Sequence, residues 1–372
     1  MSGDISIAGS FGGVFRGRRV LVTGHTGFKG AWLSQWLLDL GARVSGIALP
    51  PNTEPSLFEQ LALESRLDHH IQDIRQPAPV AALLRDIRPD FVFHLAAQPL
   101  VRLSYRQPVE TWDTNVLGAI HILEALRPLD HPCAAVFITT DKCYENREWL
   151  YAYREADPLG GHDPYSSSKA AAEIAISAWR RSFFQDSPVK IASARAGNVI
   201  GGGDWALDRI VPDAMRALAS GEPIPVRNKT STRPWQHVLE PLGGYLWLAA
   251  LLSGPDSAPF CDAFNFGPRL ESNRTVAQLV TELLEHRPGQ WEDRSDPNAP
   301  HEAGRLNLSI EKAFHLLAWR PVWDFEETIA RTSEWYGEVA QSIRTPLAVT
   351  TAQIAAYTAS ARQSALPWSH PS

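Results

Sequence analysis

The stretch RRVLVTGHTGFKG (residues 18–30) decides which fold we expect for this chain. Its first part is a short apolar, β-branched run that ends in glycine, which is typical of a buried strand. The following FKGAWLSQWLLDLG (28–41) carries apolar residues at helical spacing, and Gly41 provides a C-terminal stop. Glycines between a strand and a helix let the backbone approach a pyrophosphate at the positive end of the helix. A glycine-rich turn without a ligand has the same sequence, but its place between strand and helix favours a dinucleotide site.

Strands and helices continue to alternate after this unit. Further strands are expected at 43–49, 90–97 and 134–140, and further helices at 79–88 and 113–127. Strands that are apolar on both faces and separated by helices predict an α/β fold, a doubly wound parallel sheet of the Rossmann type with a smaller C-terminal substrate-binding lobe. The expected divisions are a flexible leader (1–17), a dinucleotide-binding domain (18–200), a substrate-binding lobe partly interleaved with it (201–345), and a C-terminal helix with a loose tail (346–372).

Bulk properties exclude several classes of protein. The chain has 372 residues, a formal net charge of -6 and three widely spaced cysteines, which gives no reason to expect nucleic acid, a disulfide framework or a metal site. The longest apolar stretch, GGYLWLAALLSG (243–254), is too short to span a bilayer and is interpreted as a buried helix. The N-terminus lacks the pattern of a signal peptide. We therefore expect a cytoplasmic protein with no membrane partner.

A tyrosine and a lysine four residues apart indicate redox chemistry on a hydroxyl group. In DPYSSSKAAAEIAISAW (163–179), Tyr165 and Lys169 lie one turn apart on one face of an expected helix. A phenol is too weak a base at neutral pH unless a neighbouring ammonium favours the phenolate. Upstream, an expected strand ends in two threonines, and Thr139 or Thr140 would supply a hydroxyl beside the tyrosine.

Several motifs together resemble the extended short-chain dehydrogenase/reductase family. They are TGHTGFKG, HLAAQ, the Tyr165/Lys169 pair and RAGNVIGGGD (195–204), and the resemblance covers about residues 18–340. It implies an NAD cofactor, a sugar-nucleotide substrate and a homodimer formed through two long helices. It also assigns the hydroxyl role to Thr140 and a substrate contact to Asn198. The expected cofactor contacts are Gly24, Thr26, Gly27, Phe28, Lys29, Gly30, Asp73, Ile74, Leu95, Ala96, Ala97, Gln98, Asn115, Tyr165 and Lys169.

Two of these contacts stay open. Lys29 is either a phosphate contact or a solvated lysine, and Asp73 is either an adenine contact or a surface aspartate. The second expected strand ends in IALPPNTEP, with neither the carboxylate that would hold an adenine ribose nor an arginine for a 2′-phosphate. The residues therefore leave NAD and NADP unresolved. Guanidinium forks suit phosphate oxygens, so the expected substrate contacts also include Arg102, Arg209, Arg233 and Arg305.

Within the family, TTDKCYENREW (139–149) and YREADPLGGHDPYSSSK (153–169) are similar to one branch, the CDP-glucose 4,6-dehydratases. The resemblance implies removal of water from a 4-keto hexose after transient hydride transfer. Alternatives are a dTDP- or GDP-linked 4,6-dehydratase, or an epimerase or reductase on the same scaffold.

A dehydratase also needs an acid and a base. Asp141 would donate a proton to the departing C6 hydroxyl, which requires burial that favours its protonated form. dTDP-glucose relatives carry Asp-Glu where this chain has Asp141-Lys142, which leaves the base at C5 open. Lys142 is that base if burial or nearby positive charge lowers its pKa; otherwise it only stabilises the enolate, and Glu145 or Tyr165 takes the proton. The alternative is that Asp141 and Lys142 form a plain surface pair.

Overall fold

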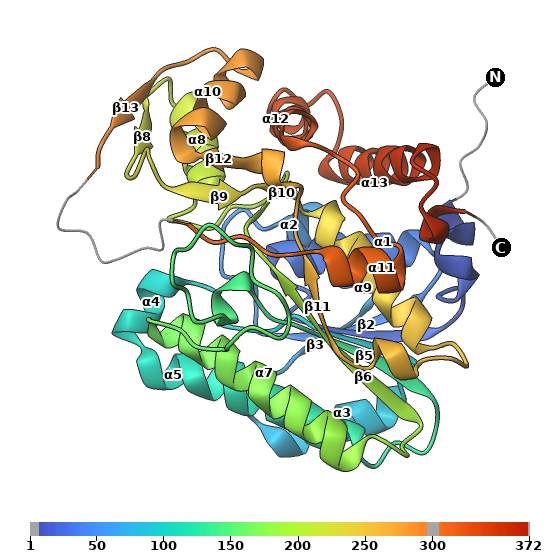
Figure 1. The fold of residues 1–372 in the computed structure, drawn as a ribbon. Helices are drawn as coiled ribbons and strands as arrows, with labels where there is room; N and C mark the ends of the chain where they lie inside the picture. The colour runs from blue at the N-terminus through green and yellow to red at the C-terminus, as the bar shows by residue number, and fades with distance from the viewer. Residues whose placement is uncertain (1–6, 296–304, 371–372) are drawn as a thin grey trace.

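The strand and helix around the glycine turn form the centre of a seven-stranded parallel sheet (Figure 1). The computed structural model describes residues 7–295 and 305–370. The strand order is β3-β2-β1-β4-β5-β6-β11, and every pair in it is parallel. The predicted doubly wound parallel sheet is confirmed. Its strands are β1 (Arg19–Thr23), β2 (Arg43–Ala48), β3 (Asp68–Ile71), β4 (Phe91–His94), β5 (Cys133–Ile138), β6 (Val189–Ala196) and β11 (Ala263–Phe266).

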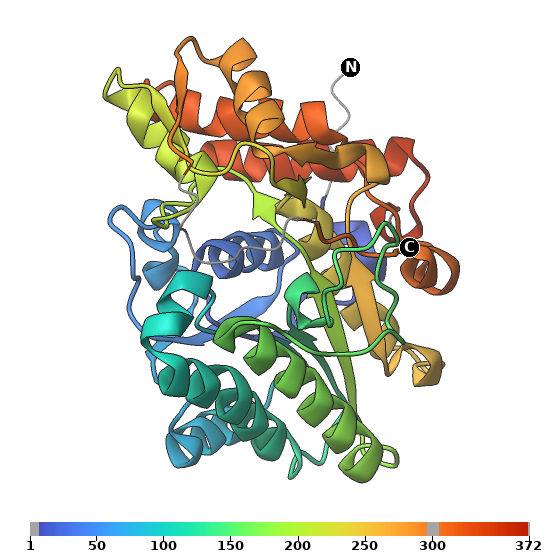
Figure 2. The ribbon, with the colours of Figure 1, turned by 60° about the vertical axis from the view of Figure 1, so that its left-hand side comes forward.

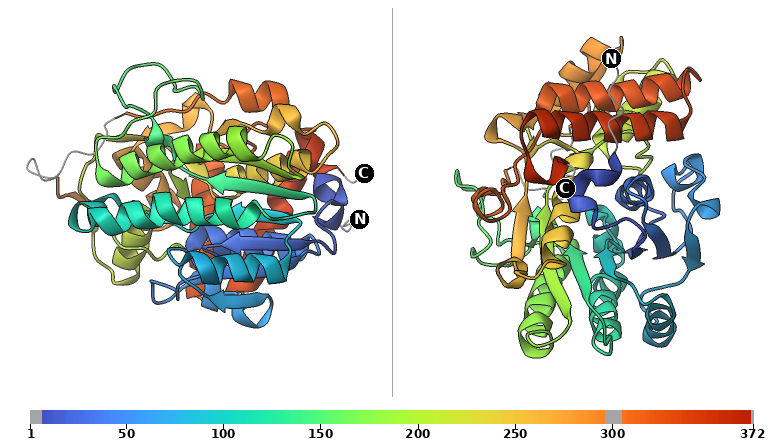
Figure 3. Two further views of the ribbon diagram at one scale, coloured as in Figure 1. Left: turned by 90° about the horizontal axis from the view of Figure 1, so that it is seen from below. Right: turned by 90° about the vertical axis from the view of Figure 1, so that its right-hand side faces the viewer.

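Helices cover both faces of this sheet because its strands are apolar on both sides. Along β1, Leu21 enters one hydrophobic core while Val20 and Val22 enter the other. Seen from below, the helices of the first face lie side by side (Figure 3). They are α3 (Pro77–Ile87), α4 (Val101–Arg106), α5 (Pro108–Trp112), a π-helical turn (Asp113–Leu117), α6 (Gly118–Leu126) and α7 (Pro164–Phe183). The second core gathers α1 (Phe28–Asp39), α2 (Leu57–Gln60), α9 (Leu239–Leu252), α11 (Glu311–Leu317), α12 (Phe325–Ala340) and α13 (Pro346–Gln363).

A smaller lobe lies beyond the carboxyl ends of the strands (Figure 2). It is built from three two-stranded pairings and two helices. Its elements are β7 (Val199–Ile200), α8 (Ile210–Ala219), β8 (Ile224–Val226), β9 (Thr232–Pro234), β10 (Gln236–His237), β12 (Asn273–Thr275), α10 (Val276–His286) and β13 (Trp291–Asp293). Between these elements the chain returns to the sheet as α9 and β11, so the lobe and the sheet share one connected core.

The expected flexible leader and loose tail are packed where the structure describes them. Phe11, in the 3₁₀ segment Ile7–Gly13, and Phe15 are buried in the core. Phe11 stacks on Trp368 of the 3₁₀ turn Pro367–Ser369, with ring centroids 4.9 Å apart. The two ends of the chain therefore stabilise each other through aromatic contacts, which the sequence pattern of either segment alone does not predict. None of the described helices combines the length and apolar character needed to cross a membrane.

Candidate active site

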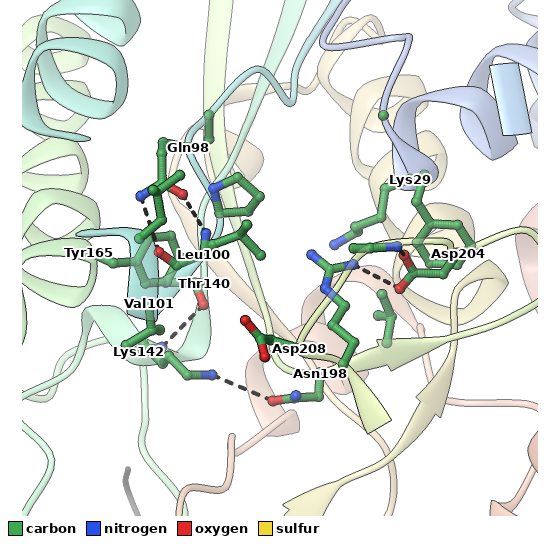
Figure 4. Close-up of a pocket in the computed structure, with 18 of the residues that line it drawn as sticks. Lys29, Gln98, Leu100, Val101, Thr140, Lys142, Tyr165, Asn198, Asp204 and Asp208 are labelled. Carbon is green, nitrogen blue, oxygen red and sulfur yellow. Dashed lines mark hydrogen bonds and ion pairs between the residues drawn. The ribbon is translucent and has the colours of Figure 1, made fainter. Parts of the chain in front are cut away.

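A cavity of about 810 Å³ opens at the carboxyl ends of the central strands, and residues of the smaller lobe also line it (Figure 4). Loops that follow β1, β4, β5 and β6 all line it. The strand order reverses between β1 and β4, which is where open parallel sheets bind their ligands. Its volume lies in the range of small-molecule sites.

The glycine turn lines one side of this cavity. Gly24 has a positive φ of 75°, and a Cβ there would lie 2.8 Å from the backbone of Ala96 at the end of β4. A Cβ on Gly30 would meet the Gly24 carbonyl oxygen at 2.1 Å. Gly27 begins α1 without a side-chain cap, so the first N–H groups of the helix stay open to an anion. These features fit the pyrophosphate of a dinucleotide.

We expect Gly24→Ala to destabilise the protein by about 1–3 kcal/mol, because the new methyl group needs a strained φ and clashes with a backbone that cannot move freely. Gly27→Ala is the matched control, since the nearest atom to its Cβ would be 3.5 Å away. Urea unfolding of both variants measures the difference. Equal stabilities would show that the turn relaxes around a side chain.

Tyr165 and Lys169 lie on the buried face of α7, as their spacing predicts. Asp163 caps this helix by accepting from the Ser166 N–H at 2.9 Å, and Pro164 occupies its first turn. Burial raises the pKa of the Tyr165 phenol, and a hydrogen bond with Thr140 acts in the opposite direction. Burial lowers the pKa of Lys169 to about 8, against a raising effect of the nearby Glu173 carboxylate.

The two threonines at the end of β5 have different partners. Thr139 donates a hydrogen bond to the buried Glu173 at 2.5 Å. Thr140 lies beside Tyr165 and donates to Asp141 Oδ1 at 3.0 Å. Of the two hydroxyls, Thr140 is therefore the one placed next to the tyrosine.

Asp141 is not part of a surface pair. Its side chain is 1% exposed and lines the cavity, and one of its carboxylate oxygens, Oδ2, has no hydrogen-bond partner among the residues that the structure describes. Gly197 gives it room, because a Cβ there would lie 2.9 Å from this oxygen. The Lys142 amine lies 3.6 Å from Asp141 Oδ1 and donates to Asn198 Oδ1 at 3.5 Å. The structure thus brings an acid, an amine and an amide together.

The structure excludes one candidate base from the site. Glu145 is exposed, does not line the cavity, and turns its carboxylate toward Gly160. Glu145 therefore lies outside the cavity, and we no longer consider it as the base at C5. Lys142 and Tyr165 remain.

Most of the expected site residues line the cavity, and two do not. Asn115 is buried behind it and holds the Gln98 backbone by accepting from its N–H at 2.8 Å and donating to its carbonyl at 3.2 Å. Arg305 is exposed and lies outside the lining, so we withdraw it as a substrate contact. The expected residues in the lining are Gly24, Thr26, Gly27, Phe28, Lys29, Gly30, Asp73, Ile74, Leu95, Ala96, Ala97, Gln98, Arg102, Thr140, Asp141, Lys142, Tyr165, Lys169, Asn198, Arg209 and Arg233.

Several of these groups are already engaged by neighbours. The Asp73 carboxylate accepts hydrogen bonds from Nε of Arg75 and, at 2.6 Å, from an amino group of the same residue. Asp73 therefore stabilises its own loop in addition to lining the cavity. Arg209 pairs with Asp204 at 2.8 Å, and Arg102 lies 3.8 Å from Asp208. Carboxylates therefore hold these two guanidinium groups in the cavity wall.

Sequence reasoning missed an ion-pair network at the cavity mouth and a contact deep inside it. Arg227 binds Asp208 at 2.5 Å and Asp213 at 2.7 Å. The Lys29 amine donates to the Tyr245 hydroxyl at 3.1 Å, although the two residues are far apart in the chain. Lys29 and Tyr245 both lie in stretches quoted above, but the pattern of neither stretch indicates this contact. No periodicity or spacing joins the other partners.

Comparison with known proteins gives consistent matches. The family model of GDP-mannose 4,6 dehydratase matches residues 21–332. A CDP-glucose 4,6-dehydratase of Salmonella typhimurium is 48% identical over 332 residues, which cover 87% of this chain and 91% of the relative. A dTDP-glucose 4,6-dehydratase of Xanthomonas campestris pv. campestris is 28% identical, over 85% of this chain and 92% of the relative.

Solved structures show the same fold. DesIV, a dTDP-glucose 4,6-dehydratase of Streptomyces venezuelae determined with NAD and TYD bound, has a TM-score of 0.74 and 24% identity, over 88% of this chain and 99% of that one. A UDP-glucose-4-epimerase of Stenotrophomonas maltophila with NAD bound has a TM-score of 0.75 and 20% identity, over 87% and 99%.

Proposed function

Because this chain belongs to the GDP-mannose 4,6-dehydratase family of extended short-chain dehydrogenases/reductases, we propose that it is an NAD-dependent CDP-glucose 4,6-dehydratase, a hydro-lyase. Its reaction converts CDP-glucose to CDP-4-keto-6-deoxyglucose with loss of water. The observation that carries the proposal is the position of Asp141. A buried carboxyl group lies in the same cavity as the glycine turn and the Tyr165/Lys169 pair. An epimerase or a reductase has no need of that acid.

The cofactor site is proposed from residues that fit a dinucleotide. The turn Gly24–Gly30 and the open start of α1 suit a pyrophosphate, and the loop after β4 extends the same wall. Bound NAD supplies an acceptor that takes a hydride from the hexose and returns it in the same turnover. We assign Tyr165 and Lys169 to the hydroxyl that is oxidised, because both line the same cavity as the glycine turn.

The first proton transfer is assigned to Tyr165. Its phenolate removes the proton of the C4 hydroxyl, while the Thr140 hydroxyl holds the reacting oxygen. We assign to Lys169 the stabilisation of the phenolate by its charge. The rise in the pKa of Tyr165 that burial causes is opposed by the hydrogen bond with Thr140 and by the charge of Arg209. The resulting ketone makes the C5 proton acidic.

The elimination is assigned to Asp141 and one of the two remaining bases. Asp141 gives its proton to the C6 hydroxyl, which leaves as water, while the C5 proton goes to neutral Lys142, or to Tyr165 once it has passed the C4 hydroxyl proton to solvent. The C5–H electron pair forms the C5–C6 double bond as the C6–O bond breaks. Asn198 holds Lys142 toward this region. We assign phosphate binding to Arg102, Arg209 and Arg233.

The direct test is incubation of the purified protein with CDP-glucose and NAD. The 4-keto product is detected by its absorbance in alkali, and a panel of CDP-, dTDP-, GDP- and UDP-glucose determines the base. Turnover of CDP-glucose at least tenfold above the others is expected. Release of an unchanged or epimerised sugar would contradict the proposed function, and a preference for dTDP- or GDP-glucose would contradict the CDP assignment.

We also propose a cytoplasmic homodimer. The three cysteines are free, as in a reducing compartment. Large apolar side chains are exposed on neighbouring helices of one sheet face, including Val109 (81% exposed) on α5 and Ile174 (59%) on α7. Trp112 on α5 and Leu117 in the π-helical turn that follows are exposed as well. The helices that carry these side chains lie side by side (Figure 3). Such a surface suits a second copy of the chain.

Ile174→Asp is expected to convert the dimer to a monomer, because a carboxylate would be buried without a partner in the apolar interface. Light scattering measures the mass. Ile343→Asp is the matched control, since this side chain is equally exposed (62%) but follows α12 elsewhere on the molecule. A dimer that survives the change at Ile174 would place the interface on another surface.

A further inference from the structure

The acid of the proposed elimination, Asp141, lies in a short 3₁₀ turn, Asp141–Cys143, that follows β5. The backbone hydrogen bonds of this turn are long. The Cys143 N–H lies 3.4 Å from the Thr140 carbonyl, and the Tyr144 N–H lies 3.5 Å from the Asp141 carbonyl. Bonds of this length in a 3₁₀ turn hold the backbone weakly. The position of Asp141 in the cavity therefore depends on contacts made outside the turn.

Both flanks of this turn are tied to one buried ion pair, between Glu173 on α7 and Arg195 on β6. The carboxylate and the guanidinium lie 2.7 Å apart, and both side chains are buried. On the N-terminal flank, the Thr139 hydroxyl donates to Glu173 Oε1 at 2.5 Å. On the C-terminal flank, Arg195 Nη1 donates to the Tyr144 hydroxyl at 2.8 Å. The ion pair thus holds the chain on both sides of Asp141.

The Tyr144 hydroxyl also has a second anchor. It donates to Asn265 Oδ1 on β11 at 2.7 Å while it accepts from Arg195. The Arg195 guanidinium lies 5.0 Å from the centre of the Tyr144 ring and donates to the Glu155 carbonyl at 3.1 Å. Hydrogen bonds between buried groups are strong when one of the groups is charged. Tyr144, which also lines the cavity, is therefore fixed against two strands of the sheet.

The helix that provides Glu173 also carries the two residues assigned to the oxidation step. Tyr165, Lys169 and Glu173 follow one another at intervals of four residues, so they lie on one face of α7, and all three are buried. Thr140 and Lys142 lie on the same side of the cavity as Tyr165 (Figure 4). The ion pair therefore connects the turn that carries the proposed acid to the helix that carries the proposed base.

We propose that Thr139 and Tyr144 are positioning residues, which hold Asp141 in place for the elimination through their bonds to the Glu173–Arg195 pair. This inference rests on the proposed dehydratase function. A proton donor that is displaced by about 1 Å can lose about 10²-fold in rate, although it keeps its chemistry. Oxidation at C4 is assigned to side chains on α7 itself. A loosened turn is therefore expected to slow the elimination more than the oxidation.

The first test is Tyr144→Phe, which removes the anchoring hydroxyl and keeps the ring and the ion pair. We expect its kcat for CDP-glucose to fall by about 10–10²-fold with little change in KM. Reduced nicotinamide should accumulate during turnover, because the sugar is oxidised faster than water is lost, and absorbance spectroscopy measures it. A merely structural role would lower the stability of the variant and would change neither kcat nor this absorbance once the protein is folded.

Tyr153→Phe is the matched control for this variant. The Tyr153 ring stacks on Tyr144 with centroids 5.2 Å apart, but its hydroxyl bonds to Asn146 and to the Arg147 N–H, outside the anchoring network. This variant also loses a tyrosine hydroxyl, and we expect it to keep the wild-type kcat. Circular dichroism checks that each variant is folded.

A pair of changes at the other flank tests the same inference and carries it alone if Tyr144→Phe does not fold. Thr139→Val removes the donor to Glu173 with little change of shape, and kcat should fall by about tenfold. Thr139→Ser keeps the hydroxyl and should restore wild-type turnover. Equal kcat values for the valine and serine variants, or wild-type turnover by Tyr144→Phe, would overturn this inference alone. A wild type that does not convert CDP-glucose would overturn the proposed function and this inference together.

Discussion

Asp141→Asn is expected to lower turnover of CDP-glucose by about 10²–10⁴-fold, the usual contribution of a general acid. The asparagine keeps the shape of the side chain but has no acidic proton for the departing C6 hydroxyl. Because Asp141 is buried, bulk water cannot take its place. Oxidation at C4 does not need this proton. We therefore expect reduced nicotinamide to accumulate when the variant meets its substrate, and absorbance spectroscopy measures it.

The control for this result is Asp208→Asn. Asp208 also lines the cavity, but it lies at the mouth and is half exposed. It pairs with Arg227 at 2.5 Å, and its contact with Arg102 is longer, at 3.8 Å. If the loss of one negative charge in the cavity were enough to stop turnover, both variants would be inactive. We expect Asp208→Asn to lose less than about tenfold, as for an exposed ion pair. Unchanged turnover of Asp141→Asn would remove this residue from the mechanism and favour an epimerase or reductase.

Glu173→Gln is expected to cost about 3–5 kcal/mol of folding free energy, because it leaves a buried guanidinium without its charge partner. The Glu173 carboxylate lies 2.7 Å from Arg195 and also accepts from Thr139 and Ser193. Burial opposes its charged form, but Arg195 and these hydrogen bonds outweigh burial and lower the pKa of Glu173. The stabilisation is therefore present at neutral pH and is lost on acidification, as the pH falls through this lowered pKa.

Urea unfolding at several pH values measures this effect. The difference between the wild type and Glu173→Gln should be largest near neutral pH and should shrink in acid. Glu124→Gln is the matched control, since its ion pair with Arg127 is exposed and contributes less than about 1 kcal/mol. Equal losses from both changes would mean that Glu173 and Arg195 do not act as a buried pair.

Local patterns determined much of this protein. An apolar run that ends in glycine, followed by apolar residues at helical spacing, indicates a strand, a turn and a helix, so the stretch 18–41 predicted β1, the glycine turn and α1. Tyr165 and Lys169 share a face because four residues make about one helical turn. Three strands of the sheet were not predicted. The short strand β3 lacks an apolar pattern, β6 interrupts its apolar residues with Lys, Ser and Arg, and β11 lies among irregular segments.

The electrostatic environment of the site was decided by tertiary structure alone. Asp141 and Glu145 are four residues apart in one loop, yet the fold buries the first in the cavity and leaves the second outside. Lys29 meets Tyr245, and Glu173 meets Arg195, across long stretches of chain. Burial and the charge of a distant neighbour set protonation, and neither is written in local sequence spacing. The sequence thus determined which chemical groups the cavity contains, and packing determined which of them can hold or release a proton.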